Sequence, residues 1–152
     1  APEAVARVIA SWRAEGGVMH TLTDLSPGLG SYITFEEYPS HPAYYTRNGF
    51  GYTMLGLYDW TTVESAIAVD EPRAAHYFEC ARATLSYSLP YYDLNGFSAY
   101  DLGHVISGVK PNLQPYYHAF HIGLLHAING VSPDPTLAYY EARWRDDIDS
   151  PP

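Results

Sequence analysis

Three short stretches of the sequence place a tyrosine beside a carboxylate or a histidine, a combination that can move protons. They are Glu37-Tyr38, Tyr100-Asp101 and Tyr117-His118. A carboxylate is ionised at neutral pH and can accept a proton, whereas tyrosine, with a reference pKa of about 10, can donate one. Judged by residue type alone, packing tyrosines and a solvated acidic turn are the alternative interpretation. These residues are therefore candidates for acid/base chemistry.

Two histidines, His118 and His121, have the i, i+3 spacing of a helix face and could suggest a metal pair. No third ligand stands at a matching offset, and the single cysteine, Cys80, cannot form a cysteine-rich zinc site. We therefore expect no metal and no cofactor. Both histidines are predicted to pack or to form hydrogen bonds.

The candidates fall where irregular segments meet helices. Apolar periodicity predicts helices over 3–15, 44–60, 72–89, 117–128 and 135–148. The predicted stops are Gly16-Gly17, Pro90 and Asn129-Gly130, and Asp134 is expected to cap the last helix beside Pro135. The segment 18–35 predicts a short β-hairpin around Ser26-Pro27-Gly28, and 91–114 predicts a long loop with a tight turn at Asn95-Gly96.

The length of 152 residues and an apolar share of 47% predict one domain, 1–152, with a real core. The fold class is mainly α, with helical hairpins side by side as part of an incomplete α/α barrel, or toroid. The short β-hairpin or extended loops are expected near the active site, where side chains from different hairpins could converge.

The charge balance excludes some functions. A net charge of −9, from 8 basic and 17 acidic residues, argues against nucleic acid or anionic membranes as partners. No stretch is typical of a signal peptide or a membrane span, so the chain as given is expected to be soluble. Tyrosine, at 15 residues, is unusually frequent, and its flat face with a hydroxyl suits sugar rings as well as protein interfaces.

Three longer stretches resemble the C-terminal domain of the D-glucuronyl C5-epimerases. They read EEYPSHPAYYTRNGFGYTMLGLYDW, then LPYYDLNGFSAYDLGH, then PNLQPYYHAFHIGLLHAI. The resemblance covers roughly residues 35–144, with the motifs EEYP, NGF with GLYD, YDLxH and YHxxH in the same succession. It implies an incomplete α/α barrel and the conversion of D-glucuronate to L-iduronate within heparosan or heparan sulfate. The animal relatives act in the Golgi lumen.

Carried over residue by residue, the resemblance implies that Glu37 and Tyr38 are the active-site acid and tyrosine of EEYP. Tyr100 is the tyrosine of YDLxH, and Tyr117 is the catalytic tyrosine of YHxxH. One residue fewer separates Tyr117 from PNL than in the animal enzymes, so Tyr116 is a rival for its role.

The chemistry implied by the resemblance suits these residue types. Inversion at C5 of a uronate requires removal of a proton from one face and its return to the other, hence two acid/base groups. Glu37 opposite Tyr117 is a workable pair. Tyr38, Tyr100 and His118 are expected to support the ionised tyrosine in the reverse direction.

The sequence departs from the family at Gly103, where the animal enzymes have an arginine suited to the substrate carboxylate. Arg47 is expected to replace it, because a guanidinium binds a carboxylate in a bidentate manner. The full set of predicted substrate-binding residues is Arg47, Asn48, His104, Tyr116 and His118. The few basic residues favour a non-sulfated polymer.

Other functions use similar groups. A polysaccharide lyase abstracts the same C5 proton before β-elimination, and a non-catalytic carbohydrate-binding helical domain is a third interpretation. The family's N-terminal helices and β-rich region are expected to be absent, with about thirty-four residues ahead of Phe35. A missing N-terminal portion or a second copy is the expected partner for the exposed edges of a partial barrel.

Overall fold

A computed structural model describes residues 2–64, 73–95 and 97–149 of the chain. Within them lie six α-helices, and the fold is mainly α as expected. They are α1 (Pro2–Trp12), α2 (Arg47–Glu64), α3 (Arg73–Tyr92), α4 (Gly103–Ile106), α5 (Pro115–Val131) and α6 (Pro135–Asp149). Helix α2 packs against α3 and α5, and α6 packs against α5 and α3, so these four helices form a bundle. Whether the bundle is part of a barrel stays a prediction.

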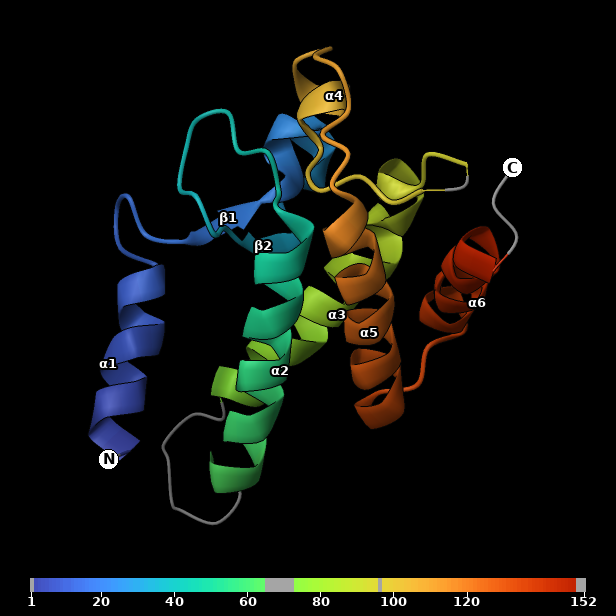
Figure 1. Ribbon diagram of the computed structural model, residues 1–152. Coiled ribbons are helices and arrows are strands. Elements are labelled where there is room, and N and C mark those ends of the chain that lie inside the picture. The colour runs from blue at the N-terminus through green and yellow to red at the C-terminus, as the bar shows by residue number, and fades with distance from the viewer. Residues whose placement is uncertain (1, 65–72, 96, 150–152) are drawn as a thin grey trace.

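The predicted hairpin is confirmed. Strands β1 (Met19–Thr21) and β2 (Ile33–Phe35) pair antiparallel, with Met19 opposite Phe35. Two 3₁₀ turns, Leu22–Asp24 and Pro27–Leu29, join them. Figure 1 shows this hairpin, α4 and the first turns of α2 and α5 at one end of the bundle. That end carries the segments that hold the candidate residues.

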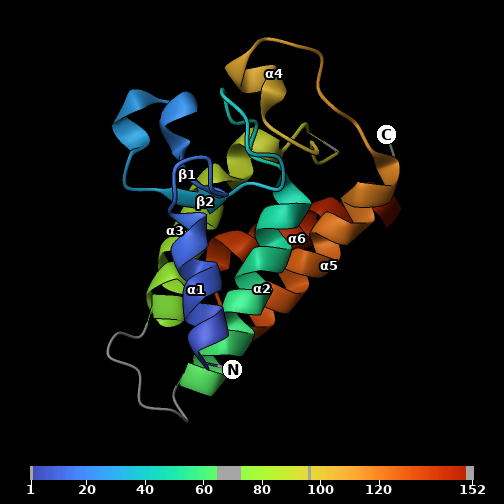
Figure 2. The same ribbon diagram turned by 90° about the vertical axis from the view of Figure 1, so that its left-hand side faces the viewer.

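The core is built from apolar faces of all the long helices. Its largest fully buried side chains include Phe35, Met54, Leu85, Leu125 and Trp144. Helix α1 lies beside α2 (Figure 2) and adds Ile9, while Trp12 meets Phe35 edge to face at 5.1 Å between ring centroids. Burial of such side chains contributes about 1.5–3 kcal/mol each.

Several predicted helix ends are wrong. Helix α3 continues through Pro90 to Tyr92, and α5 continues through Asn129-Gly130 to Val131. Proline lacks one N–H and a glycine costs about 1 kcal/mol, which a packed helix end can absorb. Helix α1 stops at Trp12 and not at Glu15, and after Trp12 i→i−3 turn bonds replace the helical ones: the Arg13 N–H donates to the Ala10 carbonyl at 3.3 Å and the Ala14 N–H to the Ser11 carbonyl at 3.2 Å. The sequence also gave no sign of the short α4.

Helix α2 begins at Arg47 rather than Tyr44 because Tyr45 is left-handed, with φ of 58°. A non-glycine residue pays for that conformation, so its surroundings must fix it. The Tyr45 N–H donates to Glu36 Oε2 at 3.0 Å, and its carbonyl accepts the Tyr92 hydroxyl at 2.5 Å. The Tyr45 hydroxyl donates to the Thr21 carbonyl at 2.8 Å. Tyr45 therefore ties the hairpin and α3 to the start of α2.

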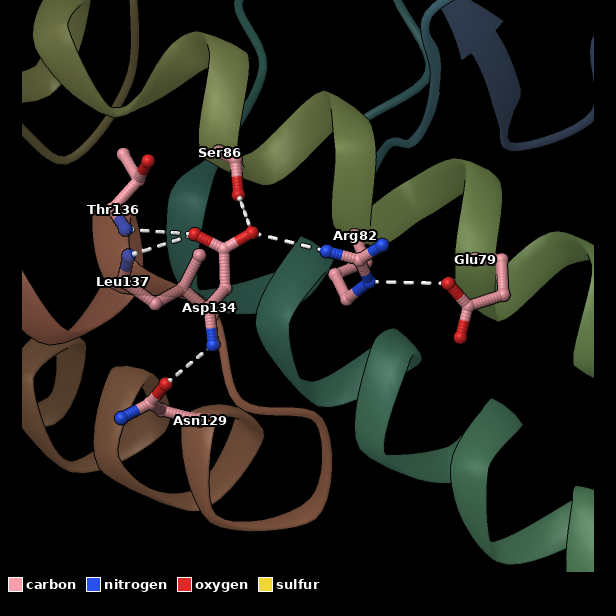
Figure 3. Close-up of polar contacts among 7 residues, drawn as sticks. All are labelled: Glu79, Arg82, Ser86, Asn129, Asp134, Thr136 and Leu137. Atoms are coloured by element: carbon pink, nitrogen blue, oxygen red, sulfur yellow. Dashed lines mark hydrogen bonds and ion pairs between the residues drawn. The ribbon is translucent and has the colours of Figure 1, made fainter.

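Asp134 fastens the other end of the bundle (Figure 3). As expected, it caps α6: its Oδ1 accepts the N–H groups of Thr136 (2.8 Å) and Leu137 (3.3 Å). Its Oδ2 accepts Ser86 Oγ at 2.8 Å and Arg82 Nη1 at 3.0 Å, both from α3. One carboxylate thus holds the α5–α6 turn against α3.

Candidate active site

The four residues predicted to be catalytic come from three separate segments. Glu37 and Tyr38 follow β2, Tyr100 lies in the segment before α4, and Tyr117 is in the first turn of α5. The rings of Tyr100 and Tyr117 meet edge to face with centroids 4.8 Å apart. A hydrogen bond links Tyr100 with Tyr38, and Glu37 is close enough to act on Tyr100 by its charge. The tertiary structure brings all four together.

Glu37 is held at the start of α2. Its Oε2 accepts a hydrogen bond from Asn48 Nδ2 at 3.3 Å. A Cβ on Gly49 would lie 2.7 Å from Glu37 Oε2 and 2.8 Å from Glu37 Cβ, so the absence of a side chain there makes room for Glu37. The neighbouring Glu36 points the other way, into the core, and is 4% exposed.

Tyr100 is held as a protonated phenol. Burial raises the pKa of Tyr100 well above its ordinary value, and the hydrogen bond with Tyr38 and the negative charge of Glu37 raise it further. The backbone of Tyr100 is fixed as well, because its carbonyl accepts the Arg47 N–H and its N–H donates to the Asn112 carbonyl, both at 3.0 Å. Such a hydroxyl suits the role of a hydrogen-bond donor rather than a base.

The rival residue Tyr116 lies on the outside of the site. It is 73% exposed, and its ring meets those of Tyr117 and Phe120 at 6.0 and 4.7 Å. Tyr117 is the one that contacts Tyr100. This arrangement favours Tyr117 over Tyr116 as the acid/base.

A groove of about 450 Å³ lies between α2 and α5, and two of its lining residues, Tyr116 and Phe120, contact the ring of Tyr117. It is lined by Tyr52, Tyr116, Ala119, Phe120, Gly123 and Leu124. Its lining has no charged side chain and includes exposed tyrosine rings, which suit the apolar face of a sugar.

Arg47 occupies an unexpected place. Its side chain is fully buried beside Gly51, and none of its three guanidinium nitrogens has a partner among the described residues. Burial lowers the pKa of Arg47 to about 10, so the group stays cationic at neutral pH. This position in the core gives no support to the predicted contact between Arg47 and a substrate carboxylate.

Gly103 is tightly packed. A Cβ there would lie 3.1 Å from Asp101 Oδ1 and 3.2 Å from the ring of Tyr44, and the Gly103 N–H donates to Asp101 Oδ1 at 2.9 Å. Asp101 Oδ2 also accepts Asn112 Nδ2 at 3.0 Å, so Asp101 braces this turn. The arrangement around Gly103 leaves little space for a larger side chain.

Of the remaining predicted substrate-binding residues, two are buried and one is half-buried. Asn48 (7% exposed) orients Glu37, and His118 (3% exposed) is bonded inside the bundle to Ser98 and the Trp144 carbonyl. His104 is half-buried in α4, and its Nδ1 has no partner among the described residues. Substrate contacts by these three residues stay predictions. The packing interpretation of His118 and His121 is confirmed.

Two residues of the site region were missed by sequence reasoning, Ser98 and Tyr45. Ser98 is buried between two histidines, and Tyr45 fixes the start of α2. Neither residue type carries a signal for such a role, because their partners are distant in sequence. Within the described parts of the chain, no group of three His, Cys, Asp or Glu side chains has the geometry of a metal site. No helix in those parts is long and apolar enough to cross a membrane.

Comparisons with known proteins agree with the motifs. The family model described as "D-glucuronyl C5-epimerase C-terminus" matches residues 3–146. A curated D-glucuronyl C5-epimerase of Caenorhabditis elegans is 36% identical over 120 residues. The match covers 74% of this chain and 20% of the nematode protein, so the chain spans about a fifth of that relative's length.

Proposed function

Since the chain belongs to the family of the D-glucuronyl C5-epimerase C-terminus, we propose that it carries acid/base groups of an epimerase. The substrate is D-glucuronate within a heparosan-type polymer, and the product is L-iduronate. The observation that carries the proposal is the meeting of Tyr100 and Tyr117 beside Glu37 and Tyr38, from segments far apart in sequence. A carboxylate and phenols at one place are what inversion of a carbon next to a carboxylate needs.

Glu37 takes the C5 proton from one face of the sugar, and the electron pair of that bond moves onto the substrate carboxylate. Tyr117 gives its hydroxyl proton to C5 on the opposite face, which inverts the carbon. Glu37 is then protonated and Tyr117 is a phenolate, and a proton passes between them through Tyr38 or solvent to restore the site. The reverse reaction uses the same groups with their roles exchanged.

Tyr100 and Tyr38 stabilise the charge that develops on the substrate carboxylate. A phenol whose pKa is raised stays protonated and can donate a hydrogen bond to that charge throughout the reaction. The hydroxyls of Tyr100 and Tyr38 thus take the role, binding of the substrate carboxylate, that was predicted for Arg47 from the sequence. The aromatic groove beside Tyr117 offers the neighbouring sugar a surface without charge, which suits a non-sulfated unit.

Heavy water tests the proposal. The purified protein is incubated with heparosan in D₂O, and sugars are analysed by NMR and mass spectrometry. Deuterium at C5 together with iduronate supports the epimerase. Shortened chains with an ultraviolet-absorbing unsaturated uronate would identify a lyase instead. Binding of heparosan without either product, unaffected by Tyr117→Phe, would identify a non-catalytic carbohydrate-binding domain.

A further inference from the structure

Ser98 joins two histidines of α5 in the interior. Its Oγ lies 2.8 Å from Nδ1 of His118 and 2.8 Å from Nδ1 of His121, and its backbone N–H donates to Nδ1 of His118 at 3.0 Å. All three residues are buried, with exposures of 1%, 3% and 0%. A buried polar cluster is stable only if its donors face its acceptors.

The hydrogen positions follow from these contacts. Because His118 Nδ1 accepts the Ser98 N–H, its own proton sits on Nε2, which faces the Trp144 carbonyl at 3.3 Å. The Ser98 hydroxyl then donates to His118 Nδ1, so it must accept a proton from His121 Nδ1. Burial and the charge of Arg47 lower the pKa of His121 to about 2, so His121 is neutral and has one N–H to give. This arrangement of protons pairs Ser98 with both histidines, while Nε2 of His121 has no partner among the described residues.

The segment around Ser98 is fixed to α6 as well. Ser98 forms a β-bridge with Asp93, whose Oδ1 accepts the indole N–H of Trp144 at 3.1 Å. Phe97 stacks on the ring of His118, with centroids 4.5 Å apart. Asp93 is thus bonded to α6, and Ser98, its bridge partner, is bonded to α5.

Two of the candidate acid/base residues adjoin this cluster. Tyr100 follows Ser98 by two residues, and Tyr117 directly precedes His118. The bonds from Ser98 to His118 and His121 therefore join the segment that carries Tyr100 to the helix that carries Tyr117. A side chain 1 Å out of place can cost a large factor in rate.

We propose that Ser98 is a positioning residue, whose hydroxyl, bonded to His118 and His121, fixes Tyr100 against Tyr117. The effect of Ser98 on catalysis rests on the proposed epimerase function, whereas its effect on the ring contact between Tyr100 and Tyr117 does not depend on that function. Ser98 does not touch the substrate in this role. It acts through the two histidines on the spacing of the phenols.

The test compares Ser98→Ala with Ser88→Ala, a second buried serine in α3 whose hydroxyl bonds only locally, to the Leu85 carbonyl. NMR of the protein with labelled tyrosines measures the cross-peaks between the rings of Tyr100 and Tyr117 and the titration of Tyr100. We expect Ser98→Ala to weaken the cross-peaks and to bring the pKa of Tyr100 nearer its ordinary value. Ser88→Ala should leave both unchanged. Ser98→Cys fills the same space with a weaker donor and serves if the alanine variant does not fold.

The rate of deuterium uptake at C5 gives the second measurement. Ser98→Ala should lower kcat by about tenfold with KM within about twofold, since the variant keeps the groups that bind substrate but disturbs the geometry of the acid/base residues. Unchanged ring contacts and unchanged kcat in Ser98→Ala overturn the proposal. Loss of the ring contacts in a protein whose wild type takes up no deuterium supports the positioning of Tyr100 and overturns the epimerase function.

Discussion

The ring of Tyr100 meets the ring of Tyr117 edge to face at 4.8 Å, although seventeen positions separate them in the chain. The two phenols differ in their surroundings. Burial, the hydrogen bond with Tyr38 and the charges of Glu37 and Tyr117 raise the pKa of Tyr100, whereas Tyr117 contacts Tyr116 and Phe120, which line the open groove. This difference agrees with the proposal that Tyr100 is a hydrogen-bond donor and Tyr117 the residue that transfers a proton.

Removal of the Tyr117 hydroxyl is expected to stop the reaction. Tyr117→Phe keeps the ring contacts with Tyr100 and Phe120, so the fold should survive, while deuterium uptake at C5 should fall at least about a hundredfold. Tyr116→Phe is the matched control and should keep uptake within about twofold. Equal losses in the two variants would contradict the assignment of Tyr117.

Two glycines of α2 should respond in opposite ways to alanine. Gly49→Ala places a Cβ against Glu37 and should displace that carboxylate, lowering uptake by tenfold or more, on the order of a 1 Å misplacement. Gly56→Ala meets nothing within 4 Å and should stabilise the helix by about 1 kcal/mol without affecting uptake. Thermal unfolding and the deuterium assay measure the two effects. Normal uptake in folded Gly49→Ala would remove Glu37 from the proposed mechanism.

Glu36 is predicted to weaken the fold as pH rises. Burial raises the pKa of Glu36 from 4.5 to about 7, although the N–H groups of Tyr45 and Thr46 lower it. A folded-state pKa above the unfolded value means that stability is present below pH 4.5 and is lost between there and pH 7. At about 1.4 kcal/mol per pKa unit the loss is about 3 kcal/mol. Glu36→Gln should therefore gain stability over wild type between pH 5 and 8, as urea unfolding can measure; a constant difference would contradict the burial argument.

The contribution of Asp134 to stability is predicted to change with pH in the direction opposite to that of Glu36. Burial works to raise its pKa, but hydrogen bonds from Ser86, Thr136 and Leu137 and the charge of Arg82 together hold the pKa below its ordinary value of 3.8. Its stabilisation is therefore present above that value and lost as pH falls through the folded-state pKa. Asp134→Ala should cost about 2 kcal/mol at pH 7, the upper range for a lost cap, with a smaller cost at pH 3. Denaturant unfolding at the two pH values measures it, and an equal cost at both would contradict the prediction.

Arg47 offers a test of a buried cation. Because its guanidinium nitrogens have no partners among the described residues, replacement by an apolar chain of similar length removes a desolvation cost. Arg47→Met should melt at the same temperature as wild type or higher, with KM for heparosan unchanged. A large rise in KM at unchanged stability would restore the substrate-binding role predicted from sequence.

The sequence by itself determined the helical class, the hairpin and the identity of the candidate residues. Helix-period apolar residues, the Asp134-Pro135 start and the turn residues Ser26-Pro27-Gly28 are local signals, so they could be read without the fold. The ordered motifs EEYP, YDLxH and YHxxH singled out Glu37, Tyr38, Tyr100 and Tyr117. Local signals failed at Pro90 and at Asn129-Gly130, where packing outweighs the propensity of single residues.

Only the tertiary structure decided which of these residues meet. Ser98 and Tyr45 form hydrogen bonds with residues twenty or more positions away, and no local pattern encodes such partners. The tertiary structure also shows that the side chain of Arg47 is buried in the core. The sequence could not show this, because an arginine beside a turn has the same sequence context whether its side chain faces substrate or the core. The types of the candidate acid/base residues could be read from the sequence, whereas the arrangement of their side chains arises from long-range packing.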